Sequence, residues 1–194
     1  MKQYLVVDID RCWGCKSCQT ACKREHGYPP QAEDAIEVFR IENVDGQGRA
    51  QCDFVPVLCQ QCADPACVRH CPVHALRKEA DGRVALDKGA CIQCGRCLLA
   101  CPYSAMCKEE PSQPRSTVIK CDLCVERRAR GLLPACVQHC MGDALKLVPG
   151  EEMQALCANR RFWSCGQVVY LSSRLTGLGA LLPEGGSFNP ANAE

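Results

Sequence analysis

The chain has few aromatic side chains, since Phe, Trp and Tyr make up only 5% of its 194 residues. It also lacks an excess of charge: 23 Lys and Arg face 22 Asp and Glu, for a formal net charge of +1. Without a basic excess there is no electrostatic attraction to nucleic acid or to a membrane surface, so we expect neither as a partner. At 47% hydrophobic and 23% charged residues, the composition is that of a folded protein. Something other than aromatic packing must therefore stabilise its core.

A long uninterrupted apolar run is also missing. The N-terminal residues MKQYLVVDIDRC contain no apolar signal segment and no twin-arginine pair. The least polar late stretch, 162–182, contains polar residues and Arg174, whereas a transmembrane helix needs about 20 mostly apolar residues. We therefore expect a cytoplasmic location, no direct membrane insertion and no secreted disulfide scaffold. Export together with a signal-bearing partner stays open.

Cysteine is the residue in excess, with 20 in the chain, several times its ordinary usage. Sixteen of them form four groups of four along the sequence. The first group is Cys12, Cys15, Cys18 and Cys22, the second Cys59, Cys62, Cys67 and Cys71, the third Cys91, Cys94, Cys97 and Cys101, and the fourth Cys121, Cys124, Cys136 and Cys140.

The first and third groups have the C-x2-C-x2-C-x3-C spacing that binds a 4Fe-4S cluster in bacterial ferredoxins. Three closely spaced thiolates can wrap three corners of a cluster, while the fourth reaches a neighbouring cluster. The second and fourth groups keep the first pair and the last spacing around a longer middle loop. Zinc is the alternative for paired C-x2-C motifs, but it does not need this triple spacing. We therefore predict four 4Fe-4S clusters, in preference to zinc or disulfides.

A repeated tail follows three of the groups: CPVHAL at 71–76, CPYSAM at 101–106 and CMGDAL at 140–145. Such repetition indicates one small structural unit used several times. The pattern predicts a hairpin joining strands at 76–78 and 84–86, and another strand at 145–147. Short helices are expected around 96–100 and 137–140. The predicted fold class is α+β, with clusters filling space that large side chains fill in other proteins.

In this order the four groups resemble those of the four-cluster iron–sulfur subunits of the molybdopterin oxidoreductases. That family includes dimethyl sulfoxide, polysulfide and tetrathionate reductases, formate dehydrogenase and transhydroxylase. The likeness covers residues 1 to about 148. It implies two bacterial-ferredoxin-like modules of two 4Fe-4S clusters each. Residues 55–105 would form one module, and residues 1–54 with 106–148 would form a second, discontinuous one.

The resemblance also implies that the last cysteine of each group serves the cluster of its partner group. The implied ligand sets are Cys12, Cys15, Cys18 and Cys140; Cys22, Cys121, Cys124 and Cys136; Cys59, Cys62, Cys67 and Cys101; and Cys71, Cys91, Cys94 and Cys97. Some relatives have tryptophan at the second cysteine of the third group and hold a three-iron cluster. Here that position is Cys94, so four irons are expected. With four oxidised clusters bound, the formal charge would become roughly −7.

Two features depart from the family pattern. The first and fourth groups lack the proline after their last cysteine, which we expect to affect cluster potential more than occupancy. Residues 149–194 lie outside the likeness. The RRFW segment at 160–163 and the apolar stretch beyond it suggest a C-terminal docking extension for a partner. A segment packed on its own domain is an equal alternative.

Four cysteines belong to no group: Cys52, Cys107, Cys157 and Cys165. We expect them to be buried free thiols, because cysteine behaves as a small hydrophobic residue. Ligation of a cluster at a subunit interface by Cys157 and Cys165 stays open.

Other side chains near the groups have structural interpretations. His70 and His139 are expected to be solvated loop residues, although a ring N–H on a cluster sulfur would raise its potential. Trp13 is expected to shield a cluster. Arg127, Arg128 and Arg130 form a short basic patch whose default interpretation is a solvated helix face, with a docking surface as the alternative.

Motifs for catalysis are missing. There is no P-loop, G-x-S-x-G or H-E-x-x-H motif, and cysteine ligation would leave no open site on iron. We expect a non-catalytic subunit that relays single electrons to or from a large catalytic subunit holding a molybdenum or tungsten pterin. A flavin subunit, a membrane-anchor subunit or further copies of the chain are candidates for the other side. The alternative is a free-standing polyferredoxin carrier.

Overall fold

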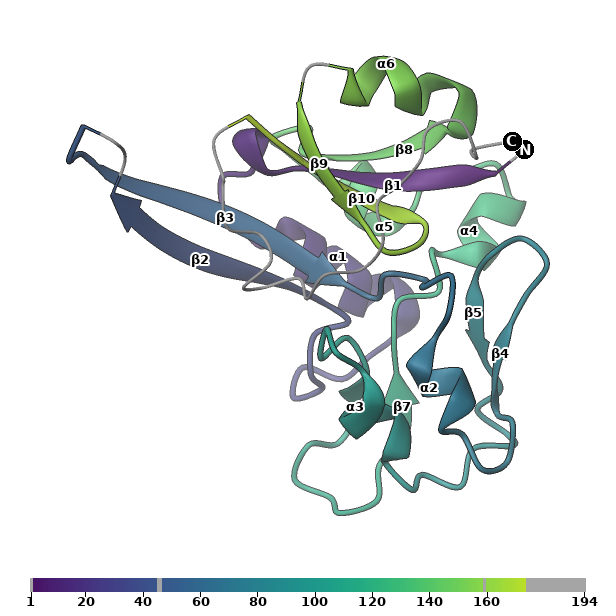
Figure 1. Cartoon of the computed structure of the whole chain (residues 1–194). Helices are drawn as coiled ribbons and strands as arrows, with labels where there is room; N and C mark the ends of the chain where they lie inside the picture. The colour runs from purple at the N-terminus through teal and green to yellow at the C-terminus, as the bar shows by residue number, and fades with distance from the viewer. Residues whose placement is uncertain (1, 45–46, 159, 174–194) are drawn as a thin grey trace.

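A mixed four-stranded sheet forms one end of the molecule, and three two-stranded sheets, short helices and loops form the rest of the described chain (Figure 1). The computed structural model describes residues 2–44, 47–158 and 160–173. The sheet has the order β8-β1-β10-β9 and consists of β1 (Gln3–Asp8), β8 (Leu145–Pro149), β9 (Arg161–Ser164) and β10 (Val168–Ser172). Strand β1 is antiparallel to β8 and parallel to β10. The expected strand at 145–147 is thus confirmed.

The two central strands are buried on both faces, because successive side chains of a strand point to opposite sides. Tyr4 and Val6 of β1 pack on the outer side against helix α6 (Met153–Cys157), which follows the short 3-10 helix η2 (Gly150–Glu152). Leu5 and Val7 point to the other side, toward the cysteine-bearing elements. The sheet therefore separates a small apolar layer from the elements that carry the grouped cysteines.

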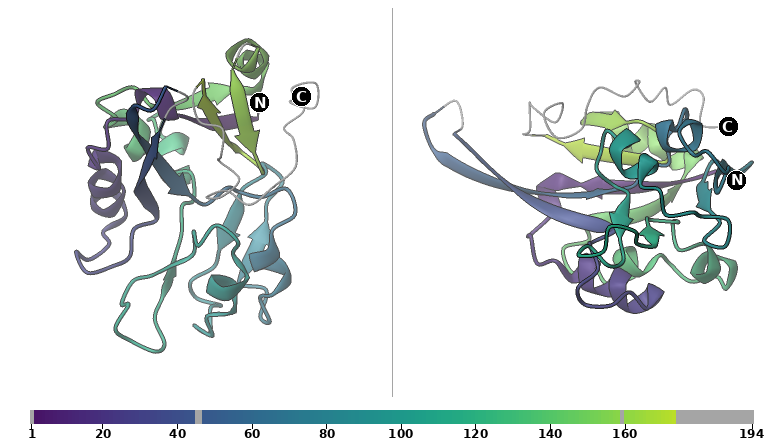
Figure 2. Two further views of the ribbon diagram at one scale, coloured as in Figure 1. Left: turned by 60° about the vertical axis from the view of Figure 1, so that its left-hand side comes forward. Right: turned by 90° about the horizontal axis from the view of Figure 1, so that it is seen from below.

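A long hairpin, which the sequence patterns did not predict, projects from the body of the molecule. Its strands are β2 (Ile36–Val44) and β3 (Ala50–Leu58), paired from Ile36 opposite Leu58 to Val44 opposite Ala50. The base of the hairpin is buried in the main core, whereas its tip projects outward (Figures 1 and 2). Only part of the hairpin therefore contributes to the packing around the cysteines.

The short elements expected from the repeats are present. Strands β4 (Leu76–Lys78) and β5 (Val84–Leu86) form the expected hairpin. Helix α3 (Arg96–Ala100) lies at its expected position, and the expected helix at 137–140 begins two residues earlier, as α5 (Ala135–Gln138). The earlier start follows from Pro134 at the N-cap, because proline favours the beginning of a helix. The remaining elements are η1 (Ile9–Arg11), α1 (Ser17–His26), α2 (Ala66–Arg69), β6 (Cys107–Lys108), β7 (Val118–Ile119) and α4 (Val125–Ala129). The α+β class is confirmed.

The helices that carry cysteines pack in two pairs. Helix α1 of the first group packs against α5 of the fourth, and α2 of the second group packs against α3 of the third. None of the helices within the described ranges has both the length and the apolar character needed to cross a bilayer.

Ten of the residues expected to form a docking extension, Pro149, Arg161–Ser164 and Val168–Ser172, belong to the sheet. Strand β10 lies between β1 and β9, and all five of its residues are buried. This placement matches the alternative, a segment packed on its own domain. Residues 174–194 of the expected extension lie outside the described residues, and the extension's role in docking stays a prediction.

Candidate metal centres

The sixteen grouped cysteines gather in four sets. Three of the sets each line one cavity: set A is Cys12, Cys15, Cys18 and Cys140; set B is Cys22, Cys121, Cys124 and Cys136; set D is Cys71, Cys91, Cys94 and Cys97. Set C is Cys59, Cys62, Cys67 and Cys101. Cys67 interacts electrostatically with Cys59 and Cys101, and Cys62 interacts with Cys59 and Cys67. Each set joins three cysteines of one group to the last cysteine of another.

The same tight turn occurs at the start of every group. The residue before the second cysteine has a positive φ in all four groups: Gly14, Gln61, Gln93 and Leu123. Three of these are not glycine, and a left-handed conformation costs a non-glycine residue about 1–2 kcal/mol. The turn brings backbone N–H groups onto the first sulfur, as in the bond from Leu123 N to Cys121 Sγ at 3.4 Å. The strained turn is therefore offset by the hydrogen bonds that backbone N–H groups donate to the sulfur.

The repeated tails form a second common turn. The third residue after the last cysteine has a positive φ in three groups, at His74, Ser104 and Asp143. The next amide then donates to the cysteine sulfur, from Ala105 N to Cys101 Sγ at 3.4 Å and from Ala144 N to Cys140 Sγ at 3.2 Å. N–H donors of this kind stabilise a negatively charged sulfur.

Burial of these thiols opposes their ionisation. Burial, together with the charges of nearby thiols, raises the pKa of Cys18 and Cys22 to about 12 and that of Cys67 to about 11. Burial also holds the pKa of Cys121 and Cys136 well above the ordinary value. Because only the thiolate binds metal, a metal must displace these protons. Sets of four thiols, most of them buried or half-buried, with sulfur-directed amides fit an iron–sulfur cluster, whose positive iron offsets the cost of ionisation.

The sets follow one another in a row. Sets A and B share helix α1, because Cys18 belongs to A and Cys22 to B. Sets C and D meet at helix α3, where Cys97 lies within the helix and Cys101 at its C-cap. Sets B and C approach each other through Cys121, whose pKa is raised first by burial and also by the charges of neighbours that include Cys59. The order is therefore A, B, C, D.

Only the two ends of this row contain exposed cysteines. Cys15 of set A and Cys94 of set D are exposed, whereas the members of sets B and C are buried or half-buried. Large apolar side chains stand exposed beside both ends. Trp13, next to set A, is 65% exposed, and Ile92, next to set D, is 54% exposed. Trp13 thus lines a cysteine cavity while also presenting an apolar surface to solvent.

The four ungrouped cysteines have different environments. Cys107 and Cys157 are buried, as expected, and Cys107 Sγ donates to the Asp34 carbonyl at 3.2 Å. The expectation of burial is wrong for Cys52, because it lies on the outer part of the long hairpin, where Arg40 donates to its sulfur. Cys165 is half-buried, and its sulfur lies 3.5 Å from that of Cys62 in set C.

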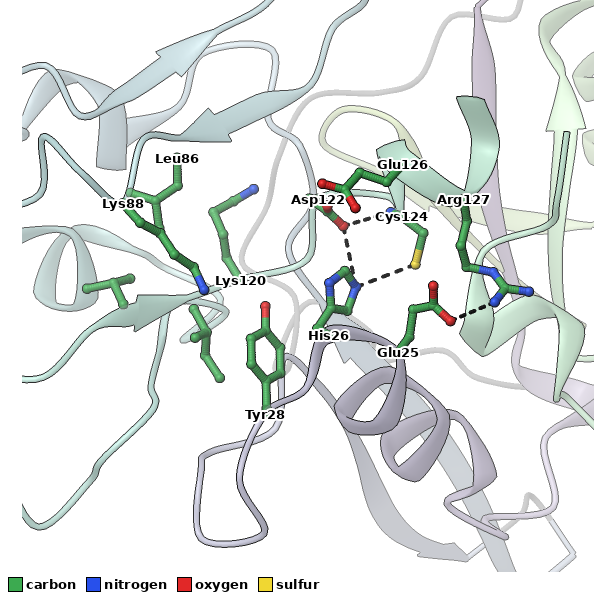
Figure 3. Close-up of a pocket in the computed structure, with 12 residues that line it drawn as sticks. Glu25, His26, Tyr28, Leu86, Lys88, Lys120, Asp122, Cys124, Glu126 and Arg127 are labelled. Carbon is green, nitrogen blue, oxygen red and sulfur yellow. Dashed lines mark hydrogen bonds and ion pairs between the residues drawn. The ribbon is translucent and has the colours of Figure 1, made fainter. Parts of the chain in front are cut away.

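Sequence reasoning missed His26, whose ring lies against set B. Its Nε2 is 3.6 Å from Cys124 Sγ and 3.6 Å from an Asp122 carboxylate oxygen, in the wall of a pocket shown in Figure 3. The contact joins residues 98 positions apart in the sequence. No local motif marks such a contact, so the sequence contained no signal for it.

Two other side chains singled out in the sequence, His70 and Arg127, contact nearby backbone or charged groups. His70 Nδ1 lies 2.8 Å from the carbonyl of Ala66 in its own helix and is exposed. Arg127 is an anchor rather than a solvated residue, because it pairs with Glu25 at 2.6 Å and donates to the Leu133 carbonyl. It therefore ties α4 to α1 and to the loop before α5.

Comparisons with known proteins agree with this geometry. Residues 50–149 match the family model of the 4Fe-4S dicluster domain. The chain is 37% identical over 141 residues to a tetrathionate reductase subunit of Salmonella typhimurium. The match covers 72% of this chain and 55% of that protein, so the chain spans about half the length of that relative. It is 34% identical over 154 residues to a component chain of the anaerobic dimethyl sulfoxide reductase of Escherichia coli, covering 76% of this chain and 74% of that protein. The corresponding protein of Haemophilus influenzae is 36% identical over 166 residues, covering 79% and 78%.

These matches confirm the resemblance identified from the cysteine groups. The chain belongs to the 4Fe-4S dicluster ferredoxin-type iron–sulfur subunits of the dimethyl sulfoxide and tetrathionate reductase family of molybdopterin oxidoreductases, and its role is electron transfer rather than catalysis.

Proposed function

We propose that the chain holds four 4Fe-4S clusters, ligated by sets A, B, C and D, and relays single electrons along them in that order. The single observation that carries this proposal is the grouping of sixteen cysteines into four sets, three of which line cavities of their own. When bound, the clusters supply one-electron carriers. The protein's own residues supply the turns, the sulfur-directed amides and the burial that set the potential of each carrier. In domain terms we propose the module 55–105 for sets C and D, and the module 1–54 with 106–148 for sets A and B.

We further propose that the two ends of the row are the places where electrons enter and leave. Exposed cysteines and apolar side chains stand at those ends, and apolar surface beside a redox centre suits contact with a partner protein. By analogy with the reductase subunits that it resembles, one partner is a large catalytic subunit with a molybdenum or tungsten pterin. A flavin subunit, a membrane-anchor subunit or another copy of the chain serves the other end. A cytoplasmic location stays a prediction from the sequence.

The alternative is a free-standing polyferredoxin, and native purification distinguishes the two. The chain is isolated anaerobically from its source by a small affinity tag and passed over a size-exclusion column. A relay subunit elutes in a complex that contains molybdenum or tungsten in stoichiometric amount. Elution of the chain alone, with its iron and sulfide but without either metal, would instead support the free carrier.

A further inference from the structure

One lysine, Lys120, is buried near sets B and C, the two sets in the middle of the row. Lys120 follows β7, directly precedes Cys121, and is only 5% exposed. Its ammonium donates to the Val84 carbonyl at 2.5 Å and to the Cys121 carbonyl at 2.6 Å. Val84 packs in an apolar cluster that contains Cys67 of set C and Cys97 of set D, whereas Cys121 belongs to set B. The ammonium therefore lies between set B and that apolar cluster.

Among the residues that the structure describes, no carboxylate pairs with this charge. Within the part of the chain that the structure describes, no ion pair involves Lys120, although Asp122 and Glu126 line the same pocket (Figure 3). Two carbonyl dipoles solvate an ammonium without neutralising it, and burying an uncompensated charge is costly. Such a charge needs an anion nearby.

The nearest candidates for that anion are the two central cysteine sets. Lys120 interacts electrostatically with Cys67 of set C and with Cys121 of set B. Four thiolates around an oxidised cluster leave a net negative charge, which reduction makes more negative. A fixed cation between two such centres stabilises both, and the reduced form more strongly.

We propose that Lys120 is the shared counter-cation of the two central clusters and raises the reduction potential of both. This inference rests on the proposed function, because it requires clusters in sets B and C. It assigns Lys120 an electrostatic role in the middle step of the relay. A purely structural role, in which the side chain only ties the Val84 carbonyl to that of Cys121, is the competing account.

Four variants separate charge from hydrogen bonding. Lys120→Met removes the charge and the donor, Lys120→Gln removes the charge and keeps a donor, and Lys120→Arg keeps both. Lys88→Met is the matched control, because Lys88 lines the same pocket but lies over the Tyr28 ring at 5.5 Å. Each protein is purified anaerobically, assayed for iron and sulfide, and titrated potentiometrically with detection by electron paramagnetic resonance.

We expect Lys120→Met and Lys120→Gln to lower the midpoint potentials of two clusters and to leave the other two unchanged. Lys120→Arg should shift them less, and Lys88→Met should not shift them. If the neutral variants lose iron, retention in Lys120→Arg still supports the charge role, whereas loss in Lys120→Arg as well overturns it. Unchanged potentials in the neutral variants, or an equal shift of all four clusters, would also overturn it. A wild-type protein with iron for fewer than four clusters would contradict the proposed function instead.

Discussion

At the scale of single residues, the neighbours of a cysteine distinguish a cluster ligand from an ordinary thiol. Cys136 is buried in set B among Cys22, Cys121 and Cys124, whereas Cys52 is exposed on the hairpin and accepts a hydrogen bond from Arg40. The two residues are of the same type and differ in their surroundings. Their surroundings predict opposite consequences of the same substitution.

Replacement of Cys136 by serine should remove one cluster or convert it to a three-iron form. The iron content should fall by up to about a quarter, because one of four clusters is affected. Cys52→Ser, the control, should keep the wild-type iron content. Iron and sulfide analysis of anaerobically purified protein checks both. Equal iron in the two variants would remove Cys136 from the ligand set.

A second residue-scale prediction concerns Cys165. Its thiol lies 3.5 Å from Cys62 Sγ and is also hydrogen-bonded with Tyr103. A hydrogen bond to a ligating sulfur raises the potential of a cluster. Cys165→Ala should therefore lower the midpoint potential of one cluster without loss of iron, whereas Cys157→Ala should change neither. Loss of iron from Cys165→Ala would show that this cysteine is a ligand.

At the scale of elements, a charged cluster fastens the end of β1 to the end of β10. Arg160 donates to both carboxylate oxygens of Asp8 at 2.7 Å and to Asp10 at 2.8 Å. Asp10 in turn accepts hydrogen bonds from Ser172 Oγ and from the backbone N–H of Ser173. The sheet that backs the cysteines is therefore closed by polar contacts as well as by packing.

Arg160→Met should destabilise the protein by about 2 kcal/mol, since it removes charge-assisted hydrogen bonds at a partly buried site. The neighbouring Arg161, which is exposed on β9, gives the control variant Arg161→Met. Thermal loss of the visible cluster absorption measures the difference. If the thermal midpoints of the two variants fall by the same amount, the Arg160 contacts do not contribute to the stability of the protein.

The contribution of the Asp10 carboxylate to protein stability depends on pH with a definite sign. Partial burial by itself raises the pKa of Asp10, but hydrogen bonds from Ser173, Ser172 and Arg160 outweigh it and lower the pKa to about 2. The stabilisation by Asp10 is therefore complete above the unfolded value of 3.8 and is lost only as the pH falls through about 2. The stability difference between wild type and Asp10→Asn should be constant from about pH 5 to pH 8. A difference that varies across this range would contradict the assignment.

The elements also show how far the sequence could predict the structure. The β4–β5 hairpin and helix α3 follow from local turn residues and cysteine spacing, and both were predictable. The parallel pairing of β1 with β10 was not, because it joins Leu5 to Val168 across most of the chain. The contact of His26 with Cys124 was missed for the same reason. Local motifs encode local geometry, whereas long-range partners depend on the whole fold.

At the scale of the whole molecule, the four cysteine sets lie in a row with buried centres and exposed ends. Within the described chain, the sheet packs against sets A, B and C but not against set D, and the paired helices carry cysteines from one set to the next. The formal charge of +1 describes the chain without iron. With four oxidised clusters, the molecule becomes an anion of roughly −7, which is the charge that partner surfaces must accommodate.

The central claim is that the chain holds four 4Fe-4S clusters, and metal analysis of anaerobically purified protein tests it most directly. The account predicts about sixteen irons and about sixteen acid-labile sulfides per chain, without stoichiometric zinc. A content of about eight irons and eight sulfides, or zinc without sulfide, would contradict it.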